Sequence, residues 1–291
     1  MMNAEPMPIA AAGKTRRSMS TRQRVLFLVV AWLILLMPFL FWWNTWFGRQ
    51  LSDKQLGEYL QDNNKPRHIQ HALVQIGDRM TRHDAGVARW YPEVVRLSSY
   101  PVEEVRNTDA WVMGQDVSSA AAKSAGFHAA LLKMLSDPSL LVRGNAALSL
   151  VRFGDASGKP QIVALLQPAT VTAPQAGKVV DTSSVGTPIH QHGLLAKLEA
   201  GGQTIEIRSP IGGRIRTLSV ETGQTVANGA NIATVAPEEN QVWEALRALY
   251  LVGQAEDLTA VIPYERDSPD SSDRVRQQAA LTDQAIRSRA R

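Results

Sequence analysis

The most distinctive hydrophobic pattern in the chain is an unbroken apolar stretch near its start. Val25–Gly48 contains no charged residue in 24 positions. A helix rises about 1.5 Å per residue, so this stretch is long enough to cross a hydrocarbon layer of about 30 Å. Amphipathic indole rings favour the membrane–water interface, and the downstream end of the stretch carries Trp42, Trp43 and Trp46. The pattern predicts a transmembrane helix over residues 25–48, which would bring the protein into contact with a lipid bilayer.

The residues before this stretch predict its orientation. Residues 1–24 form a basic leader with a single acid, Glu5, against Lys14, Arg16, Arg17, Arg22 and Arg24. A cleavable signal peptide is the alternative, but cleavage needs small residues, and the stretch ends in the bulky sequence WWNTWFG. The positive-inside rule keeps a basic leader in the cytoplasm. We therefore expect a single-pass inner (plasma) membrane protein whose bulk is periplasmic or otherwise extracytoplasmic.

Helical periodicity fills residues 51–167 and 240–291, and it recurs along the chain. Arg106 and Ala110 stand 37 residues before Arg143 and Ala147, and His68 and Ala72 stand 38 residues earlier still. Downstream, Ala245 and Ala280 are 35 residues apart. This period resembles that of HEAT repeats, in which small residues lie at helix crossings and a Val-Arg pair opens a helix. The resemblance implies an α-solenoid of stacked helix pairs with an extended exposed surface. An irregular helical domain with a coincidental spacing stays open as the alternative.

Two predictions about side chains follow from the resemblance to a solenoid. Arg106, Arg143 and Arg276 lie in the first turns of predicted helices, where they would form a charge ladder between repeats. Trp111 falls at the spacing of repeat cores, so packing is its expected role and an aromatic binding groove is the alternative.

Short Val, Ile and Thr runs separated by Gly and Pro replace the helical pattern in residues 169–237, which is typical of short strands. The segment contains the same half-motif twice. Pro174 and Gly177 recur 36 residues later as Pro210 and Gly213, and Gly186 with Ile189 recurs as Gly223 with Val226. This duplication resembles the biotinyl/lipoyl-carrier, or barrel-sandwich hybrid, family. The expected fold class is an α+β multidomain protein: a transmembrane helix and a HEAT-like α-solenoid interrupted by a β barrel-sandwich hybrid domain.

The resemblance implies a specific position for a cofactor. In carrier domains the hairpin that joins the two halves presents a modified lysine, and here that position falls on Gly202. The nearest lysine, Lys197, lies five residues upstream within a strand pattern. Since glycine has no amine to acylate, we expect no biotin, no lipoate and no other cofactor. Periplasmic adaptor (membrane fusion) proteins also carry an unmodified module behind a membrane anchor. They usually insert a long helical hairpin between its halves, whereas a few residues around Gly201 form the link here.

Composition narrows the function further. The 31 basic and 27 acidic residues give a net charge of +4, too small to indicate a nucleic-acid partner, and the absence of cysteine excludes disulfides and thiol catalysis. The chain also lacks nucleophile-elbow, phosphate-loop and zinc-protease motifs, so we expect no enzyme activity and no catalytic residue. His68 and His71 share a predicted helix face, and His190 and His192 are expected on the same side of a strand. Neither pair has an evident third ligand, so no metal site is predicted.

The sequence therefore predicts a membrane-anchored, non-enzymatic scaffold or adaptor in the cell envelope. Its partners would be envelope proteins, in a homo- or hetero-oligomer, and an accessory subunit of a transport or secretion complex is the alternative. Loop residues on a rigid scaffold commonly make binding contacts. The candidate partner-binding residues are His190, Gln191, His192, Gly201 and Gly202.

Overall fold

The computed structural model describes residues 20–46, 50–267 and 271–291, which divide into two compact units, Met1–Leu51 and Ser52–Arg291. In the first unit, helix α1 spans Thr21–Trp46 and includes Pro38. Among the described residues, no helix combines the length and the apolar character that a membrane crossing requires. Most of the predicted leader and the last two residues of the predicted apolar segment, Phe47 and Gly48, lie outside the described residues. The membrane crossing stays a prediction.

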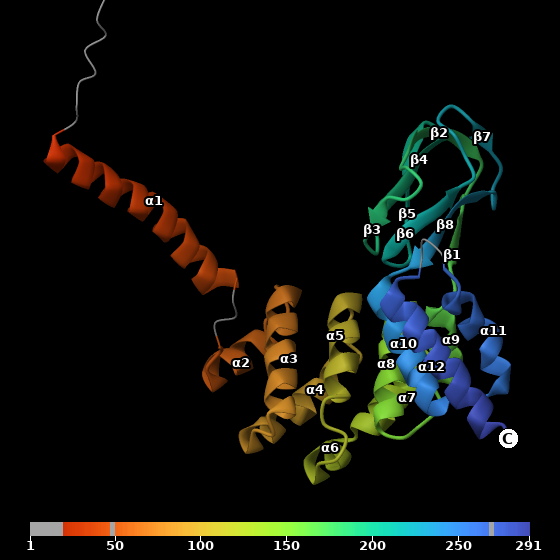
Figure 1. Cartoon of the computed structure of the whole chain (residues 1–291), viewed down its shortest axis with the longest axis horizontal. Coiled ribbons are helices and arrows are strands. Elements are labelled where there is room, and N and C mark those ends of the chain that lie inside the picture. Colours follow the sequence, from red (N-terminus) through yellow and green to blue (C-terminus); the bar gives the residue numbers. More distant parts are fainter. Residues whose placement is uncertain (1–19, 47–49, 268–270) are drawn as a thin grey trace, which may run out of the picture. The chain divides into compact units, whose positions relative to one another are not determined.

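The second unit contains a row of helices that is interrupted by a β-module. The long helices α3, α5, α8, α10 and α12 lie side by side in chain order, with the shorter helices between them (Figure 1). We call this row the helical array. Before the module the elements are α2 (Asp53–Leu60), α3 (Pro66–Thr81), η1 (Ala85–Trp90), α4 (Tyr91–Leu97), α5 (Glu103–Met113), α6 (Ala120–Ala125), α7 (Phe127–Met134), α8 (Leu140–Arg152) and α9 (Lys159–Leu165). After it come α10 (Glu239–Val252), η2 (Ala255–Asp257), α11 (Leu258–Val261), η3 (Ile262–Glu265) and α12 (Asp273–Arg289).

Neighbouring long helices repeat the same contacts at the predicted period. The Ser149 hydroxyl of α8 donates to the Ala110 carbonyl of α5 at 2.7 Å, and the Thr282 hydroxyl of α12 donates to the Leu246 carbonyl of α10 at 2.9 Å. Ala110, Ala147 and Ala245 are fully buried, as expected for small residues where helices approach. The prediction for Ala280 was wrong by one residue, because Ser272 caps α12 in a register that buries Ala279 and exposes Ala280.

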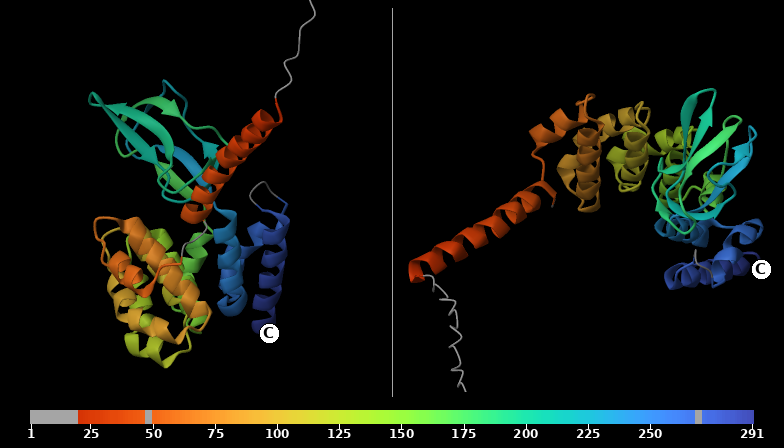
Figure 2. Two further views of the ribbon diagram at one scale, coloured as in Figure 1. Left: turned by 90° about the vertical axis from the view of Figure 1, so that its left-hand side faces the viewer. Right: turned by 90° about the horizontal axis from the view of Figure 1, so that it is seen from above.

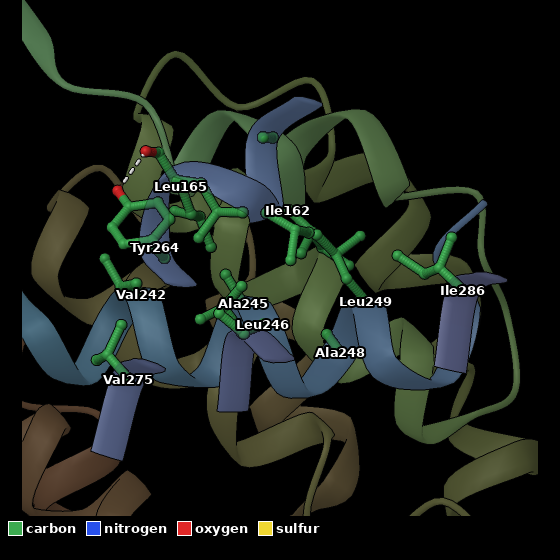
Figure 3. Packing of buried hydrophobic residues seen from close by; sticks show 14 of the residues in the cluster. Ile162, Leu165, Val242, Ala245, Leu246, Ala248, Leu249, Tyr264, Val275 and Ile286 are labelled. Atoms are coloured by element: carbon green, nitrogen blue, oxygen red, sulfur yellow. Dashed lines mark hydrogen bonds between the residues drawn. The ribbon is translucent and has the colours of Figure 1, made fainter. Parts of the chain in front are cut away.

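The hydrophobic core continues across the point where the module is inserted. Ile162 and Leu165 of α9 belong to the same buried cluster as Val242 and Leu246 of α10 (Figure 3). The Tyr264 hydroxyl also donates to the Leu166 carbonyl at 2.6 Å and so fastens η3 to the end of α9. The helices before and after the module therefore form one array.

The module is a sandwich of two antiparallel four-stranded sheets. Their strand orders are β1-β8-β6-β3 and β5-β4-β2-β7. Adding four to each strand number of the first order, with counting continued from β8 to β1, gives the second order. This symmetry confirms the two half-motifs in the sequence. The strands are β1 (Ala169–Thr172), β2 (Gly177–Thr182), β3 (Pro188–Ile189), β4 (Leu194–Ala200), β5 (Gln203–Arg208), β6 (Gly213–Leu218), β7 (Thr225–Val226) and β8 (Asn231–Pro237).

Buried aliphatic residues from both sheets fill the space between them. Val179 of β2 pairs with Leu198 of β4 in one sheet, and Ile215 of β6 pairs with Val235 of β8 in the other. All four side chains are fully buried in one cluster. The protein is thus an α+β protein with a helical region and a lipoyl-like β-sandwich.

One glycine of the duplicated motif is required by the sandwich backbone. Gly213 has φ of 154°, and a Cβ atom added there would lie 1.8 Å from the Ala236 carbonyl oxygen of the neighbouring strand. Only a residue without a Cβ fits at this separation. At the adjacent Gly212 the nearest atom to an added Cβ is 3.5 Å away, so a methyl group fits there.

The substitution Gly213→Ala is expected to destabilise the module by about 2–4 kcal/mol, because the strands must separate or the backbone must shift to admit the methyl group. Gly212→Ala is the matched control and should unfold at nearly the wild-type urea concentration. Equal unfolding midpoints for the two variants would contradict the close approach of β6 and β8.

A buried carboxyl group without a hydrogen-bond partner lies within the packed helices of the array. Asp109 of α5 is fully buried, and neither of its side-chain oxygens has a hydrogen-bond partner. The residue 37 positions later, at the equivalent place in α8, is the buried Ala146. Burial raises the pKa of the Asp109 carboxyl well above its ordinary value, and the charge of Arg96 opposes that rise. The fold therefore favours the protonated form.

Asp109→Ala is expected to raise the free energy of unfolding at pH 7 by about 1–3 kcal/mol, since it removes a buried polar group without a partner. The wild-type carboxyl keeps its proton to a higher pH in the folded state than in the unfolded chain. Wild-type stability should therefore fall as the pH rises from the ordinary aspartate pKa, about 3.9, toward the raised value. Urea unfolding between pH 4 and 8 measures this slope.

The variant should lose most of that dependence on pH. Asp78→Ala, which removes an exposed carboxyl from α3, serves as the control and should keep the wild-type slope. A slope that survives in Asp109→Ala would mean that other groups produce it.

Candidate functional site

The carrier position of the module lies at the tip of an exposed hairpin. Gly201 and Gly202 connect β4 to β5 with φ of 58° and 77°, and the flanking residues Ala200 and Gln203 pair across the strands. Successive positive φ angles are typical of the tight two-residue turns that close hairpins. A Cβ added at either glycine would meet no atom within 4 Å. The tip thus has room for a side chain but holds no amine.

The nearest amines belong to strands. Lys197 lies within β4, where its ammonium is 3.8 Å from the Asp181 carboxylate of β2. Lys178 of β2 lies opposite Glu199 of β4. Both lysines are on the body of the module and not at its tip, so neither occupies the position of an attachment lysine.

The second group of candidate residues, His190–His192, lies in a turn that holds the module to the array. Strand β3 ends at Ile189, and the Gly193 amide donates to the His190 carbonyl at 2.9 Å. His192 has φ of 62°. The expectation that the two histidines share a strand face was wrong, because β3 contains only two residues and the chain turns directly after it.

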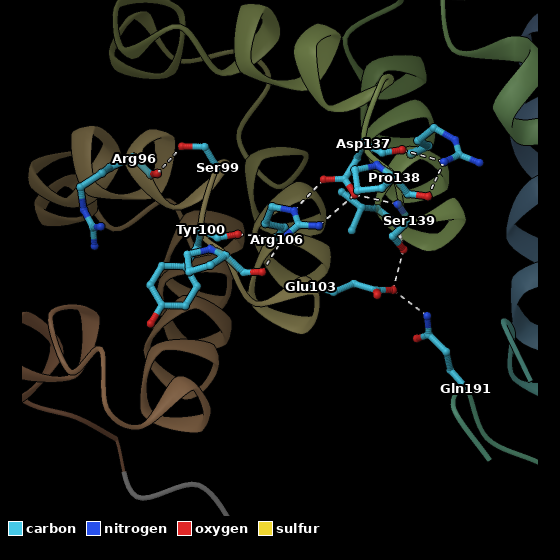
Figure 4. A network of polar contacts seen from close by, with 12 residues as sticks. Arg96, Ser99, Tyr100, Glu103, Arg106, Asp137, Pro138, Ser139 and Gln191 are labelled. Carbon is cyan, nitrogen blue, oxygen red and sulfur yellow. Dashed lines mark hydrogen bonds and ion pairs between the residues drawn. The ribbon is translucent and has the colours of Figure 1, made fainter. Parts of the chain in front are cut away.

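Glu103 of α5 is the partner of this turn (Figure 4). The Gln191 side-chain amide donates to Glu103 Oε1 at 2.6 Å, and His192 Nε2 lies 3.8 Å from Glu103 Oε2. The Ser139 hydroxyl before α8 also donates to Glu103 Oε1, at 2.6 Å. One carboxylate thus connects the module to two consecutive repeats of the array.

The same region contains the contact between repeats that the arginine pattern predicts. Arg106 binds both carboxylate oxygens of Asp137 at 2.6 and 3.0 Å. Burial opposes ionisation of Asp137, but the hydrogen bonds from Arg106 and the Ser139 amide hold the pKa of Asp137 below its ordinary value. Arg143 instead donates to the carbonyls of Asp137 and Pro138. Arg276 pairs with Asp267 and Asp273 of its own repeat. Within the described residues, Arg106 is therefore the one of the three predicted arginines that joins two repeats by an ion pair.

The five predicted partner-binding residues therefore do not form one surface. The His190–His192 turn precedes β4 and the Gly201–Gly202 turn follows it, so the two turns lie at opposite ends of a strand of seven residues, roughly 20 Å long. Gln191 is occupied by Glu103, and His192 lies close to the same carboxylate. The hairpin tip lies away from these contacts with both of its glycines exposed, and His190 is exposed as well.

The other histidine pair is engaged by its neighbours. His68 Nδ1 lies 2.8 Å from Asp62 Oδ2, and its ring stacks on Tyr59 with centroids 4.2 Å apart. His71 Nε2 is 2.8 Å from the Gln75 side-chain amide. Across the described ranges, no group of three or more His, Cys, Asp or Glu residues is arranged to hold a metal ion.

A groove across the array escaped the sequence analysis. It has a volume of about 720 Å³ and is bordered by α5, α8, α10 and α12. Trp111, for which packing was the expected role, lies in its wall with 40% of its surface exposed, although its ring also covers Gly77. The signal in the sequence was the spacing of 37 residues between Trp111 and Leu148, since both line the groove.

Comparisons with known proteins agree with the fold of the module. The family model described as "Biotin-requiring enzyme" matches residues 169–235. A biotin/lipoyl-type domain is therefore present in this part of the chain. A search of curated proteins found no match.

Solved structures resemble the chain only loosely. An engineered protein aligns with a TM-score of 0.40 and 15% identity over 81% of this chain and 80% of its own. A designed armadillo repeat protein aligns with a TM-score of 0.39 and 14% identity over 79% and 80%. A single-chain, multi-domain long-chain acyl-CoA carboxylase aligns with a TM-score of 0.24 and 18% identity over 46% of this chain and 14% of the carboxylase.

The protein purified from its native source is expected to have the mass of its unmodified sequence over residues 169–237, because the tip has no amine to acylate. Intact-mass and peptide-mass spectrometry measure this, with avidin and anti-lipoate blots as independent probes. An adduct on Lys197 or Lys178 would contradict the expectation and would indicate carrier chemistry.

Proposed function

We propose that this protein is a membrane-anchored, non-enzymatic adaptor that brings proteins together in the cell envelope. In this proposal the helical array is a HEAT-like solenoid, and the module is an unmodified docking element built into it. The observation that carries the proposal is the combination of a lipoyl-type sandwich with glycine at its exposed carrier position.

The attachment of the module supports a docking role over a carrier role. A carrier arm has to move between active sites, which requires long flexible connections. Here α9 ends at Leu165 and β1 begins at Ala169, while β8 ends at Pro237 and α10 begins at Glu239. Leu140 of α8 packs against the core of the module, and Glu103 binds Gln191. These contacts hold the module in one orientation.

The exposed hairpin tip is the part of the module that we assign to a protein partner. Gly201 and Gly202 leave the backbone uncovered, so a partner can approach it closely. The edge strand β5 begins directly after the tip and pairs only with β4 within its sheet. A tight turn beside an exposed strand edge suits recognition of another protein's backbone.

Membrane attachment completes the proposal and rests on the sequence. The apolar run Val25–Gly48 follows five basic residues, the arrangement that keeps an N-terminus in the cytoplasm. The array and the module would then lie on the opposite side of the inner membrane. An unmodified module placed after an apolar helix also favours a second role, an accessory subunit of a transport or secretion complex. The short Gly201–Gly202 link in place of a long helical hairpin argues against the usual form of such a subunit.

Deletion of residues 169–237 tests the adaptor function. Because Ile162 and Leu165 pack against α10, replacing the module with a short flexible linker should leave a folded, helical protein in the membrane fraction. Partners that depend on the module should disappear from co-purification in mild detergent. A second variant replaces Gly201–Gly202 with a longer flexible loop, which keeps the sandwich, and it should lose the partners that contact the tip.

Three results would count against the proposal. One is a wild-type protein that brings down no envelope protein, and another is a deleted protein that retains the full wild-type set of partners. A periplasmic reporter fused after Arg291 that stays inactive, together with an active cytoplasmic reporter at the same position, would reverse the proposed topology.

A further inference from the structure

The walls of the groove across the helical array repeat from helix to helix. Trp111 of α5 and Leu148 of α8 both line the groove and are 37 residues apart. Leu281 of α12 also lines it and lies at the matching position. Leu148 directly precedes Ser149, and Leu281 directly precedes Thr282. Ser149 and Thr282 make the equivalent hydrogen bonds to the preceding long helix. The groove therefore presents an apolar side chain at the same height on three of its four helices.

A second, polar row runs beside the apolar one. Asn145, Glu244 and Gln278 line the groove from α8, α10 and α12. Asn145 and Gln278 stand three residues before Leu148 and Leu281, so each lies almost one helical turn from its apolar neighbour. The long helices α8, α10 and α12 thus each offer the groove one hydrogen-bonding side chain, although the Asn145 amide already donates to Asn107 Oδ1 at 2.8 Å.

Helix α10 widens the apolar surface. Tyr250 and Leu251 are exposed by 43% and 61% of their surfaces, and Leu281 of α12 by 52%. Contiguous exposed apolar side chains on a folded protein commonly mark an interaction site. Together with Trp111 they form the apolar part of the groove wall.

The charges of the groove are unbalanced. Its lining contains two arginines, Arg152 and Arg247, and a single acid, Glu244. Glu244 is 3.6 Å from Arg247, whereas Arg152 donates to the neutral side-chain amide of Gln115 at 3.1 Å. A negative charge on an occupant would therefore be complementary to Arg152, one helical turn beyond Leu148.

The spacing of the rows selects the kind of occupant. Packed helices lie about 8–10 Å apart, and three residues of an extended chain span about 10 Å. A chain that crosses the helices in extended conformation can place side chains i, i+3 and i+9 on Trp111, Leu148 and Leu281, because α10 lies between α8 and α12. Its backbone amides would meet the polar row, since backbone groups removed from water need hydrogen-bond partners.

We infer that the groove binds an extended segment of a protein partner, with apolar side chains at positions i, i+3 and i+9 and a carboxylate that pairs with Arg152. The inference rests on the proposed adaptor function, for which it names one partner class. The binding site lies on the array and is separate from the hairpin tip of the module.

Selection from a phage-displayed library of random 12-residue peptides, on the full-length protein in detergent, tests the inference. The enriched peptides should carry aliphatic or aromatic residues at positions i, i+3 and i+9 and an Asp or Glu. A synthetic peptide with the enriched sequence is then titrated by fluorescence anisotropy against variants of the groove.

Leu251→Ser and Arg152→Glu should each weaken binding of this peptide at least tenfold. Leu132→Ser, which removes an exposed leucine from α7 outside the groove, is the matched control and should bind as wild type does. Replacing the peptide's acid with lysine should restore binding to Arg152→Glu. Thermal unfolding of each variant shows whether the array is intact, and all of these substitutions lie on exposed or half-exposed positions.

Two results would overturn the inference. One is enriched peptides with the i, i+4, i+7 pattern of an amphipathic helix; the other is selection that yields no peptide whose binding the groove variants weaken. Co-purification separates these failures from failure of the adaptor function. If Leu251→Ser retains all partners of the wild type, the groove is not their site although the adaptor function stands. If the wild-type protein has no partners, the adaptor function itself fails.

Discussion

The packing of α9 against α10 is the contact on which the architecture of Ser52–Arg291 depends. These helices are separated by the whole module in sequence, yet Ile162, Leu165, Val242 and Leu246 fill one core. Because this core closes without any residue of the module, the sandwich is an insertion that extends from the array at two neighbouring points. Figure 2 shows the strands gathered over this end of the row of helices. The module thus adds the surface of a β-sandwich to the array, while the helical core stays continuous from α9 to α10.

The short connections fix where the module begins, and the Glu103 contacts fix which way it faces. A pair of connectors alone would leave a hinge at Ala169 and Pro237. The Gln191 hydrogen bond to Glu103 is far from both connectors in sequence and removes that freedom. A carboxylate of α5 that also binds the start of α8 thus acts together with the packing of Leu140 on the module core to orient the hairpin tip.

The sequence predicted the elements well where a local rule decides them. The duplicated Pro-Gly pattern gave the two halves of the sandwich and placed Gly202 at the hairpin tip, because tight turns and close strand approaches require glycine at fixed positions. The period of the alanines gave the order of the long helices. The register of Ala280 failed, since a Ser cap and not the repeat period determines where α12 begins.

Contacts between distant segments could not be predicted in the same way. Nothing in the HQH sequence indicates that Gln191 meets Glu103, which is 88 residues away. The groove was missed for a related reason: a helix with a wide apolar face looks the same in sequence whether the outermost residue is covered or left exposed. Trp111 satisfies both descriptions, because one part of its ring covers Gly77 while another part faces the groove.

Asp109 and the groove are two features of the array that cost free energy, one inside its core and one on its surface. Alanine occupies the Asp109 position in α8, so the carboxyl is a local exception within the core, and its cost falls on stability. At the Trp111 position the repeat itself places large apolar side chains on the exposed side, where they cost free energy in water that is recovered only when they are covered. A helical array can tolerate the buried carboxyl and the exposed apolar side chains because each repeat contacts only its neighbours. The loss of stability in one repeat therefore does not extend to distant repeats. The exposed apolar row is therefore compatible with a folded array in the absence of a partner, and a partner that covers it would recover the free energy that its exposure costs.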